Sequence, residues 1–106
     1  MNEYTATNIL RTAASIIDQR ARERDLPAER SMPHTVRVFS TLTGIHLTEA
    51  QGCLFMVVLK LVRSTIGRTN PDDLIDAAAY MALTLEALTR LQENEEDEVD
   101  FDSILE

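Results

Sequence analysis

Residues 48–63 read TEAQGCLFMVVLKLVR, and this stretch decides the fold. Thr48 and Gln51 form a capping box, in which the Thr hydroxyl accepts from the Gln51 N–H and the Gln51 side chain reaches back to the start of the helix. The run that follows is apolar on nearly every side and has no alternation of period two, which favours a helix over a strand. We therefore predict a helix over residues 48–66 that is buried at the centre of the protein.

The flanking segments predict three further helices. An apolar stripe with helical spacing indicates a helix near residues 5–24. Ser31 as N-cap and Gly44 after the last turn indicate a short helix over residues 32–43. An Asn-Pro start followed by two acids indicates a long helix over residues 71–92. The predicted fold class is all-α, a small four-helix bundle.

Charge is distributed unevenly along the 106 residues, whose formal net charge is −8. Eight of the eighteen acids lie in residues 93–106, which hold no Lys or Arg, so residues 1–92 carry ten acids against ten bases. We predict one helical domain over residues 1–92, followed by an acidic tail over 93–106 that is disordered on its own. Phe101, Ile104 and Leu105 have the spacing of one helical turn and are the residues predicted to dock the tail on a partner.

Composition excludes several classes of function. A single cysteine, Cys53, excludes an intrachain disulfide framework and a cysteine-based metal cluster within one chain. The longest apolar run is far shorter than a membrane span, and no signal peptide is visible, so we expect a cytoplasmic protein. A neutral body with few aromatic residues disfavours direct nucleic-acid binding.

One constellation of charged residues spans the last two predicted helices. Lys60 and Arg63 lie one turn apart, and Asp72, Asp76 and Tyr80 step by four residues along one face. An antiparallel hairpin would bring Lys60 and Arg63 toward Asp76 and Asp72. Such a group forms either a structural ion-pair cluster or a pocket for an anionic ligand, and the structural interpretation is the commoner outcome.

A second basic group lies between the first two predicted helices, around Arg24, Arg30 and Ser31, with Arg20 and Arg22 preceding it. Charged residues between two helices usually form a solvated loop. The alternative is an anion site, in which Arg30 and the free N–H groups behind Ser31 hold a phosphate or carboxylate.

The Lys-x-x-Arg … Asp-x-x-x-Asp-x-x-x-Tyr spacing over residues 60–80 carries a resemblance that extends over residues 5–90. In this region the chain resembles a family of small proteins of unknown function from tailed phages and prophages. That family in turn distantly resembles the all-α nucleoside triphosphate pyrophosphohydrolases of the MazG type, in which carboxylates on two neighbouring helices hold Mg²⁺. Asp73 and Asp76 match the second of these carboxylate pairs, whereas Lys60 and Arg63 replace the first.

Two functional hypotheses follow. The first is a phage-type accessory protein without a cofactor that acts by binding, as a homo-oligomer such as a homodimer, in the cytoplasm of a bacterial host. Its partner would be a host protein or a nucleotide-like, phosphate-bearing anion.

The alternative hypothesis is a divergent Mg²⁺-dependent nucleoside triphosphate pyrophosphohydrolase. The resemblance implies that Asp73 and Asp76 would ligate the metal, with Glu86 or Glu49 as further carboxylates. Arg30, Lys60 and Arg63 would then hold the phosphates.

Overall fold

The computed structural model describes residues 4–23 and 31–95, which form four α-helices and contain no strand. These are α1 (Ala6–Glu23), α2 (Ser31–Thr43), α3 (Glu49–Ser64) and α4 (Pro71–Glu95). The prediction of a small all-α bundle is confirmed. None of the helices in these ranges is long and apolar enough to span a membrane.

The observed helix boundaries lie within three residues of the predicted ones. The second helix begins at Ser31 itself, so Ser31 is its first residue and not the cap before it. The largest difference is at the end of α4, which continues through Glu95 and includes the first three residues of the predicted tail. The predicted docking residues of the tail, Phe101, Ile104 and Leu105, lie outside the described residues.

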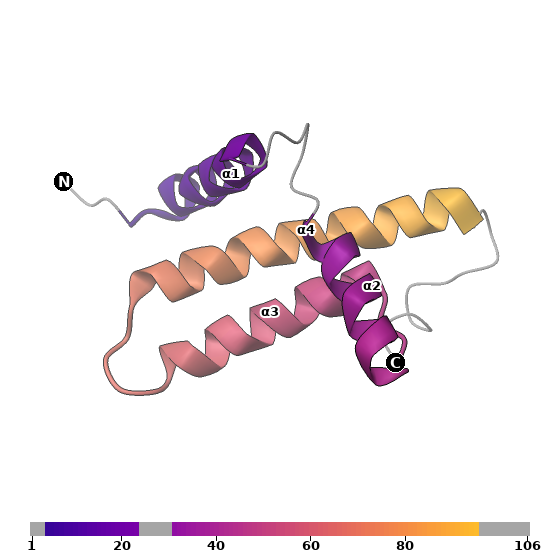
Figure 1. The fold of residues 1–106 in the computed structure, drawn as a ribbon. Coiled ribbons are helices and arrows are strands. Elements are labelled where there is room, and N and C mark those ends of the chain that lie inside the picture. The colour runs from indigo at the N-terminus through magenta and orange to yellow at the C-terminus, as the bar shows by residue number, and fades with distance from the viewer. Residues whose placement is uncertain (1–3, 24–30, 96–106) are drawn as a thin grey trace.

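The centre of the fold is an antiparallel hairpin of α3 and α4, which lie side by side (Figure 1). Helix α1 packs on the first half of α4, where Ala13 meets Ile75 and Ala79. Helix α2 crosses α3 near its start. Each outer helix therefore covers a different part of the hairpin.

The capping box at the start of α3 is confirmed. The Gln51 N–H donates to the Thr48 hydroxyl oxygen at 3.1 Å, and the Thr48 N–H donates to Gln51 Oε1 at 2.9 Å. At the other end of the hairpin Gly67 has a φ of 66°, a left-handed conformation that suits glycine. The capping box fixes where α3 begins, and Gly67 lies in the connection that separates α3 from α4.

The core of the described chain consists mainly of small side chains. Six of its ten buried hydrophobic residues are alanines. The largest side chain with less than 2% exposure is that of Cys53. The helices can therefore approach closely, but little large apolar surface is buried between them. The buried set is Ala13, Ala21, Ala50, Cys53, Val57, Ile75, Ala77, Ala79, Ala87 and Leu88.

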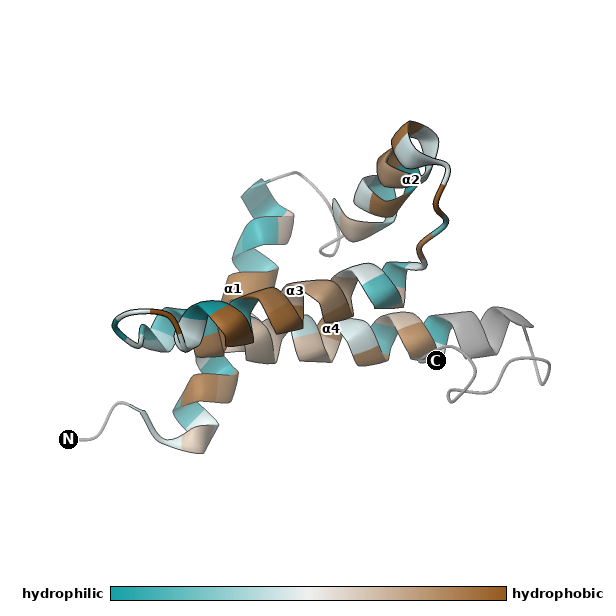
Figure 2. Ribbon diagram, turned by 90° about the horizontal axis from the view of Figure 1, so that it is seen from below, coloured by the Kyte–Doolittle hydropathy of each residue, from teal (hydrophilic) through white to brown (hydrophobic). Residues whose placement is uncertain are grey.

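The prediction that the helix over residues 48–66 is buried was wrong for most of its surface. Only Ala50, Gly52, Cys53 and Val57 of α3 are buried, and Phe55 is 66% exposed. Most of the α3 ribbon is nevertheless coloured as hydrophobic (Figure 2). The physical reason is that α3 packs on α4 along one face and on α2 near its start, so much of its apolar surface has no cover within the described chain.

Candidate functional site

The hairpin brings Lys60 of α3 against Asp76 of α4. Lys60 Nζ lies 3.0 Å from Asp76 Oδ2, and the two side chains are only 14% and 15% exposed. The sequence predicted this pair from the antiparallel geometry. A charge so little exposed needs an opposite charge nearby, and each of these residues supplies it to the other.

The second predicted pair is displaced by one residue. Arg63 Nε lies 3.8 Å from Asp73 Oδ1, so Asp73 takes the position that the sequence assigned to Asp72. Successive residues of a helix are turned by about 100°, so only one of two neighbouring acids can face α3. Asp73 is buried on that face, whereas Asp72 is exposed and donates its N–H to Asn70 Oδ1 at 3.0 Å.

Arg20 of α1 joins the same cluster, which sequence reasoning missed. Its Nη2 lies 3.5 Å from Asp76 Oδ1, and its guanidinium carbon lies 6.0 Å from the centroid of the Tyr80 ring. In the sequence, Arg20 precedes the basic group around Arg24 and Arg30 and was expected to belong to it. The signal was present, because Arg20 follows Ile16 and Ile17 at helical spacing and so continues the stripe that packs on α4.

Each charged group of the cluster faces at least one group of opposite charge. Arg20 and Lys60 both face Asp76, and Arg63 faces Asp73. In the described part of the chain, no buried side-chain nitrogen or oxygen lacks a hydrogen-bond partner. These contacts join α1 and α3 to α4, as the structural interpretation of the cluster requires.

A polar hollow of about 360 Å³ lies beside this cluster, between α1 and the first turns of α4. It contains one cation, Arg20, among three carboxylates, those of Glu23, Asp72 and Asp76, so its charge disfavours an anionic ligand. Lys60 and Arg63, which the sequence analysis assigned to anion binding, do not line it.

The anion site predicted between the first two helices cannot be built from the described residues. Arg24 and Arg30 lie outside them. Ser31 is half-buried at the start of α2, where its carbonyl accepts from the Thr35 hydroxyl at 2.9 Å. The anion site therefore stays a prediction.

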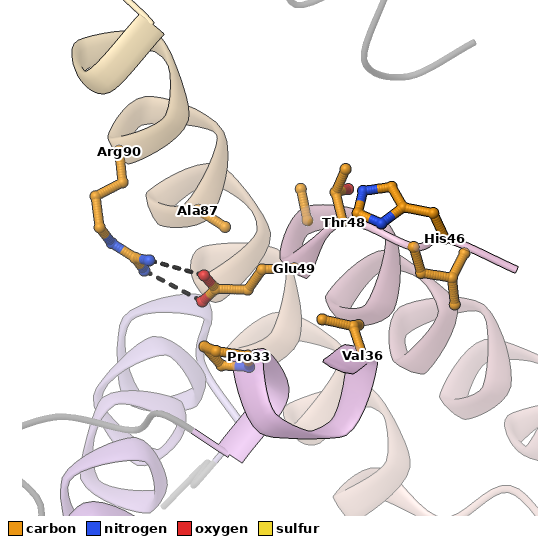
Figure 3. A pocket seen from close by; sticks show the side chains of 9 residues that line it. Pro33, Val36, His46, Thr48, Glu49, Ala87 and Arg90 are labelled. Atoms are coloured by element: carbon orange, nitrogen blue, oxygen red, sulfur yellow. Dashed lines mark hydrogen bonds and ion pairs between the residues drawn. The ribbon is translucent and has the colours of Figure 1, made fainter. Parts of the chain in front are cut away.

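A second charged group lies at the far end of the hairpin (Figure 3). Arg90 donates to both carboxylate oxygens of Glu49, at 2.7 and 3.2 Å, and to Glu86 Oε1 at 3.2 Å. The hydrogen bond to Glu49 is the main cause of the raised pKa of Arg90. This group borders a pocket of about 350 Å³ whose other walls include Pro33 and Val36 of α2.

The carboxylates required by the Mg²⁺ hypothesis are not brought together. Glu49 and Glu86 bind Arg90, and Glu86 is ten residues beyond Asp76, about 15 Å along the helix. Asp73 and Asp76 each face a cation. Among the side chains that the structure describes, there is no group of three or more His, Cys, Asp or Glu that could hold a metal ion. This donor set does not fit Mg²⁺, which takes oxygen ligands around all six of its positions.

The opposite side of the hairpin is apolar and exposed. We call it the apolar edge and define it by seven large side chains that are between 45% and 63% exposed. Next to it is a surface hollow of about 810 Å³, lined by residues of α1, α3 and α4 that include Leu10, Met81 and Leu85. The apolar edge consists of Leu10 of α1, Val58, Leu61 and Val62 of α3, and Leu74, Met81 and Leu85 of α4.

Comparison with known proteins identifies one family. The family model described as a domain of unknown function (DUF6378) matches residues 8–88. No curated protein and no solved structure matches the chain. The match covers most of α1 and of α4 and the whole of the α2–α3 segment between them, so most of the hairpin lies within the matched region.

Proposed function

This chain belongs to the DUF6378 family of domains of unknown function, and we propose that it acts by binding, as a homo-oligomer, rather than by catalysis. The resemblance to small phage and prophage proteins supports an accessory role in the cytoplasm of a bacterial host. A host protein or a phosphate-bearing ligand would be the further partner.

The observation that carries the proposal is the exposure of the apolar edge. Its seven large apolar side chains, from three helices, are each between 45% and 63% exposed. Large exposed apolar surfaces of this kind mark sites of interaction with other proteins.

A second copy of the chain is the occupant that fits this edge best. None of the seven residues is charged, so the edge supplies no electrostatic preference for a different, charged partner. Two hairpins related by a two-fold axis present the same surface to each other, as an isologous interface requires. Paired edge to edge, they would form a four-helix core that also covers the surface hollow lined by Met81 and Leu85.

The charged cluster supports binding over the pyrophosphohydrolase alternative. A metal at Asp73 and Asp76 would have to displace Arg63, Lys60 and Arg20 from the two carboxylates. Those cations would then lie beside a divalent cation, which electrostatic repulsion opposes. The distant resemblance to MazG-type enzymes is therefore most consistent with a shared helical scaffold.

Sedimentation equilibrium of the full chain, from nanomolar to micromolar concentration, tests the proposal. We expect an assembly that is a whole multiple of 11.9 kDa and dissociates on dilution. A monomer at every concentration would contradict the homo-oligomer. In parallel, a panel of nucleoside triphosphates with Mg²⁺ or Mn²⁺ should release no pyrophosphate. Release that Asp76→Asn abolishes would favour the enzyme.

A further inference from the structure

A second apolar surface lies between α2 and α3, away from the apolar edge. It is a groove of about 270 Å³ whose accessible lining is apolar throughout. Phe39 and Phe55 stand at its mouth, 37% and 66% exposed. Gly52 at its base allows α2 to cross closely, because a Cβ there would lie 2.5 Å from Met32 Sδ. The lining residues are Met32, Thr35, Val36, Phe39, Leu47, Gly52, Phe55 and Met56.

The segment that forms one side of this groove carries no acid. Residues 31–48 contain no Asp or Glu, and their ionisable residues are His34, Arg37 and His46, all exposed. Residues 96–106 are complementary, with six acids, no base and the apolar residues Phe101, Ile104 and Leu105 among others. Arg37 follows Val36, which lines the groove, and itself lines the neighbouring hollow that shares Val36 and Leu47 with the groove. An apolar groove with a cation close by and no acid on its α2 side fits a segment of this composition better than a neutral one.

The C-terminal part of α4 lies beside α2, which forms one side of the groove. Pro33 and Val36 of α2 share a pocket with Ala87 and Arg90 of α4 (Figure 3), and Val36 also lines the groove. Helix α4 ends at Glu95, about 7.5 Å beyond Arg90 along its axis. The six residues from there to position 101 span at most about 20 Å when extended.

We propose that residues 96–106 dock in the α2–α3 groove of the same chain. The side chains of Phe101, Ile104 and Leu105 fill the groove as one helical turn, and the acids face the side that carries Arg37. A connection this short gives the tail an effective concentration on the order of millimolar at the groove, so weak contacts suffice. The proposal does not depend on the apolar edge or on the oligomeric state.

Disulfide cross-linking in the full chain tests this contact. Thr35 lines the groove and Ser103 lies between the docking residues, so we would introduce Thr35→Cys together with Ser103→Cys. The matched control pairs Ser103→Cys with Ser15→Cys, on the exposed face of α1. Cys53 is 1% exposed and stays in place. We expect the groove pair to form an intrachain disulfide at least about tenfold faster than the control.

A third variant adds Phe101→Ser and Ile104→Ser to the groove pair, and its rate should fall to that of the control. Equal rates for the two pairs would overturn the proposal. A cross-linking rate that is unchanged by the two serine substitutions would also overturn it. So would a disulfide that forms only between chains, which would assign the groove to the tail of a second copy. Circular dichroism verifies that each variant keeps the helix content of the unmodified chain.

A charge reversal tests the electrostatic part without altering the groove itself. Arg37→Glu should slow cross-linking of the groove pair severalfold, and the effect should shrink in high salt because screening weakens exposed charges. Arg11→Glu makes the same change on the exposed face of α1 and should leave the rate unaltered. An equal response to both variants would contradict the role given to Arg37.

Discussion

The α3–α4 hairpin has two edges of opposite character, although the same two helices form both. On one edge Lys60 and Arg63 face Asp76 and Asp73, and Arg20 completes the cluster. On the other edge, large apolar side chains remain about half exposed. The charged cluster is satisfied within one chain, whereas the apolar edge is not. This contrast is the basis of our proposal that the first edge stabilises the single chain and that the second binds a partner.

The largest effect should come from placing a charge on the apolar edge. In a two-fold interface each subunit contributes one copy of residue 81, so Met81→Glu would bury two unpaired carboxylates. We expect the dissociation constant of the homo-oligomer to rise at least about 100-fold. Sedimentation equilibrium measures the change. Ser15→Glu adds the same charge to the exposed face of α1 and should leave the assembly intact. An equal effect of both variants would show that the apolar edge has no special role in self-association.

The next largest effect should come from breaking the centre of the charged cluster. Asp76→Ala leaves Lys60 and Arg20 without their shared carboxylate, and we expect the free energy of unfolding to fall by about 2–3 kcal/mol. Urea denaturation at one fixed protein concentration measures it.

The double variant Lys60→Met with Asp76→Leu removes both charges and should recover most of the lost stability, since apolar residues can replace a buried pair. Stability that stays unchanged in Asp76→Ala would contradict the structural role of the cluster.

A smaller effect is expected at the outer pair of the same cluster. The Arg63 side chain is 56% exposed and its nearest carboxylate oxygen is 3.8 Å away. Exposed pairs of this kind contribute little, so Arg63→Gln should change the free energy of unfolding by less than about 0.5 kcal/mol. A loss as large as that of Asp76→Ala, measured in the same urea titration, would show that the cluster acts as one unit.

The smallest effect should be that of salt on self-association. An interface without charged residues gains nothing from charge attraction, and salt screens the repulsion between two chains of net charge −8, so the dissociation constant should not rise between low and physiological salt. Sedimentation equilibrium across a salt series gives the slope. Strong weakening with salt would place charged groups in the interface.

Features fixed by local spacing could be predicted from the sequence. The Thr48–Gln51 capping box depends on four consecutive residues, and the Lys60–Asp76 pair depends on one hairpin with a short connection. The sequence could not show that Asp73, and not Asp72, faces Arg63. The conformation of residues 65–70 decides which of the two acids faces α3. Arg20 was missed because its partner lies on α4, 56 residues away in sequence.

The burial of α3 was predicted wrongly for a different reason. An apolar sequence such as Phe55–Val62 shows which side chains avoid water, but not how many helices of the same chain surround them. Here the single chain covers one face of α3, and a second subunit is our proposal for the cover of the exposed apolar edge. The end of α4 differed for a simpler reason: neither Gly nor Pro stops the helix at residue 92, and it continues to Glu95.

An isotope-filtered NMR experiment on a mixture of labelled and unlabelled full chain tests the central claim most directly. It detects methyl contacts between subunits only. The account predicts intermolecular contacts among Val58, Leu61, Met81 and Leu85, and none that involve Ala13 at the α1–α4 contact. Intermolecular contacts that involve other residues but none of the apolar edge would contradict the account. So would the complete absence of intermolecular contacts at the highest protein concentration.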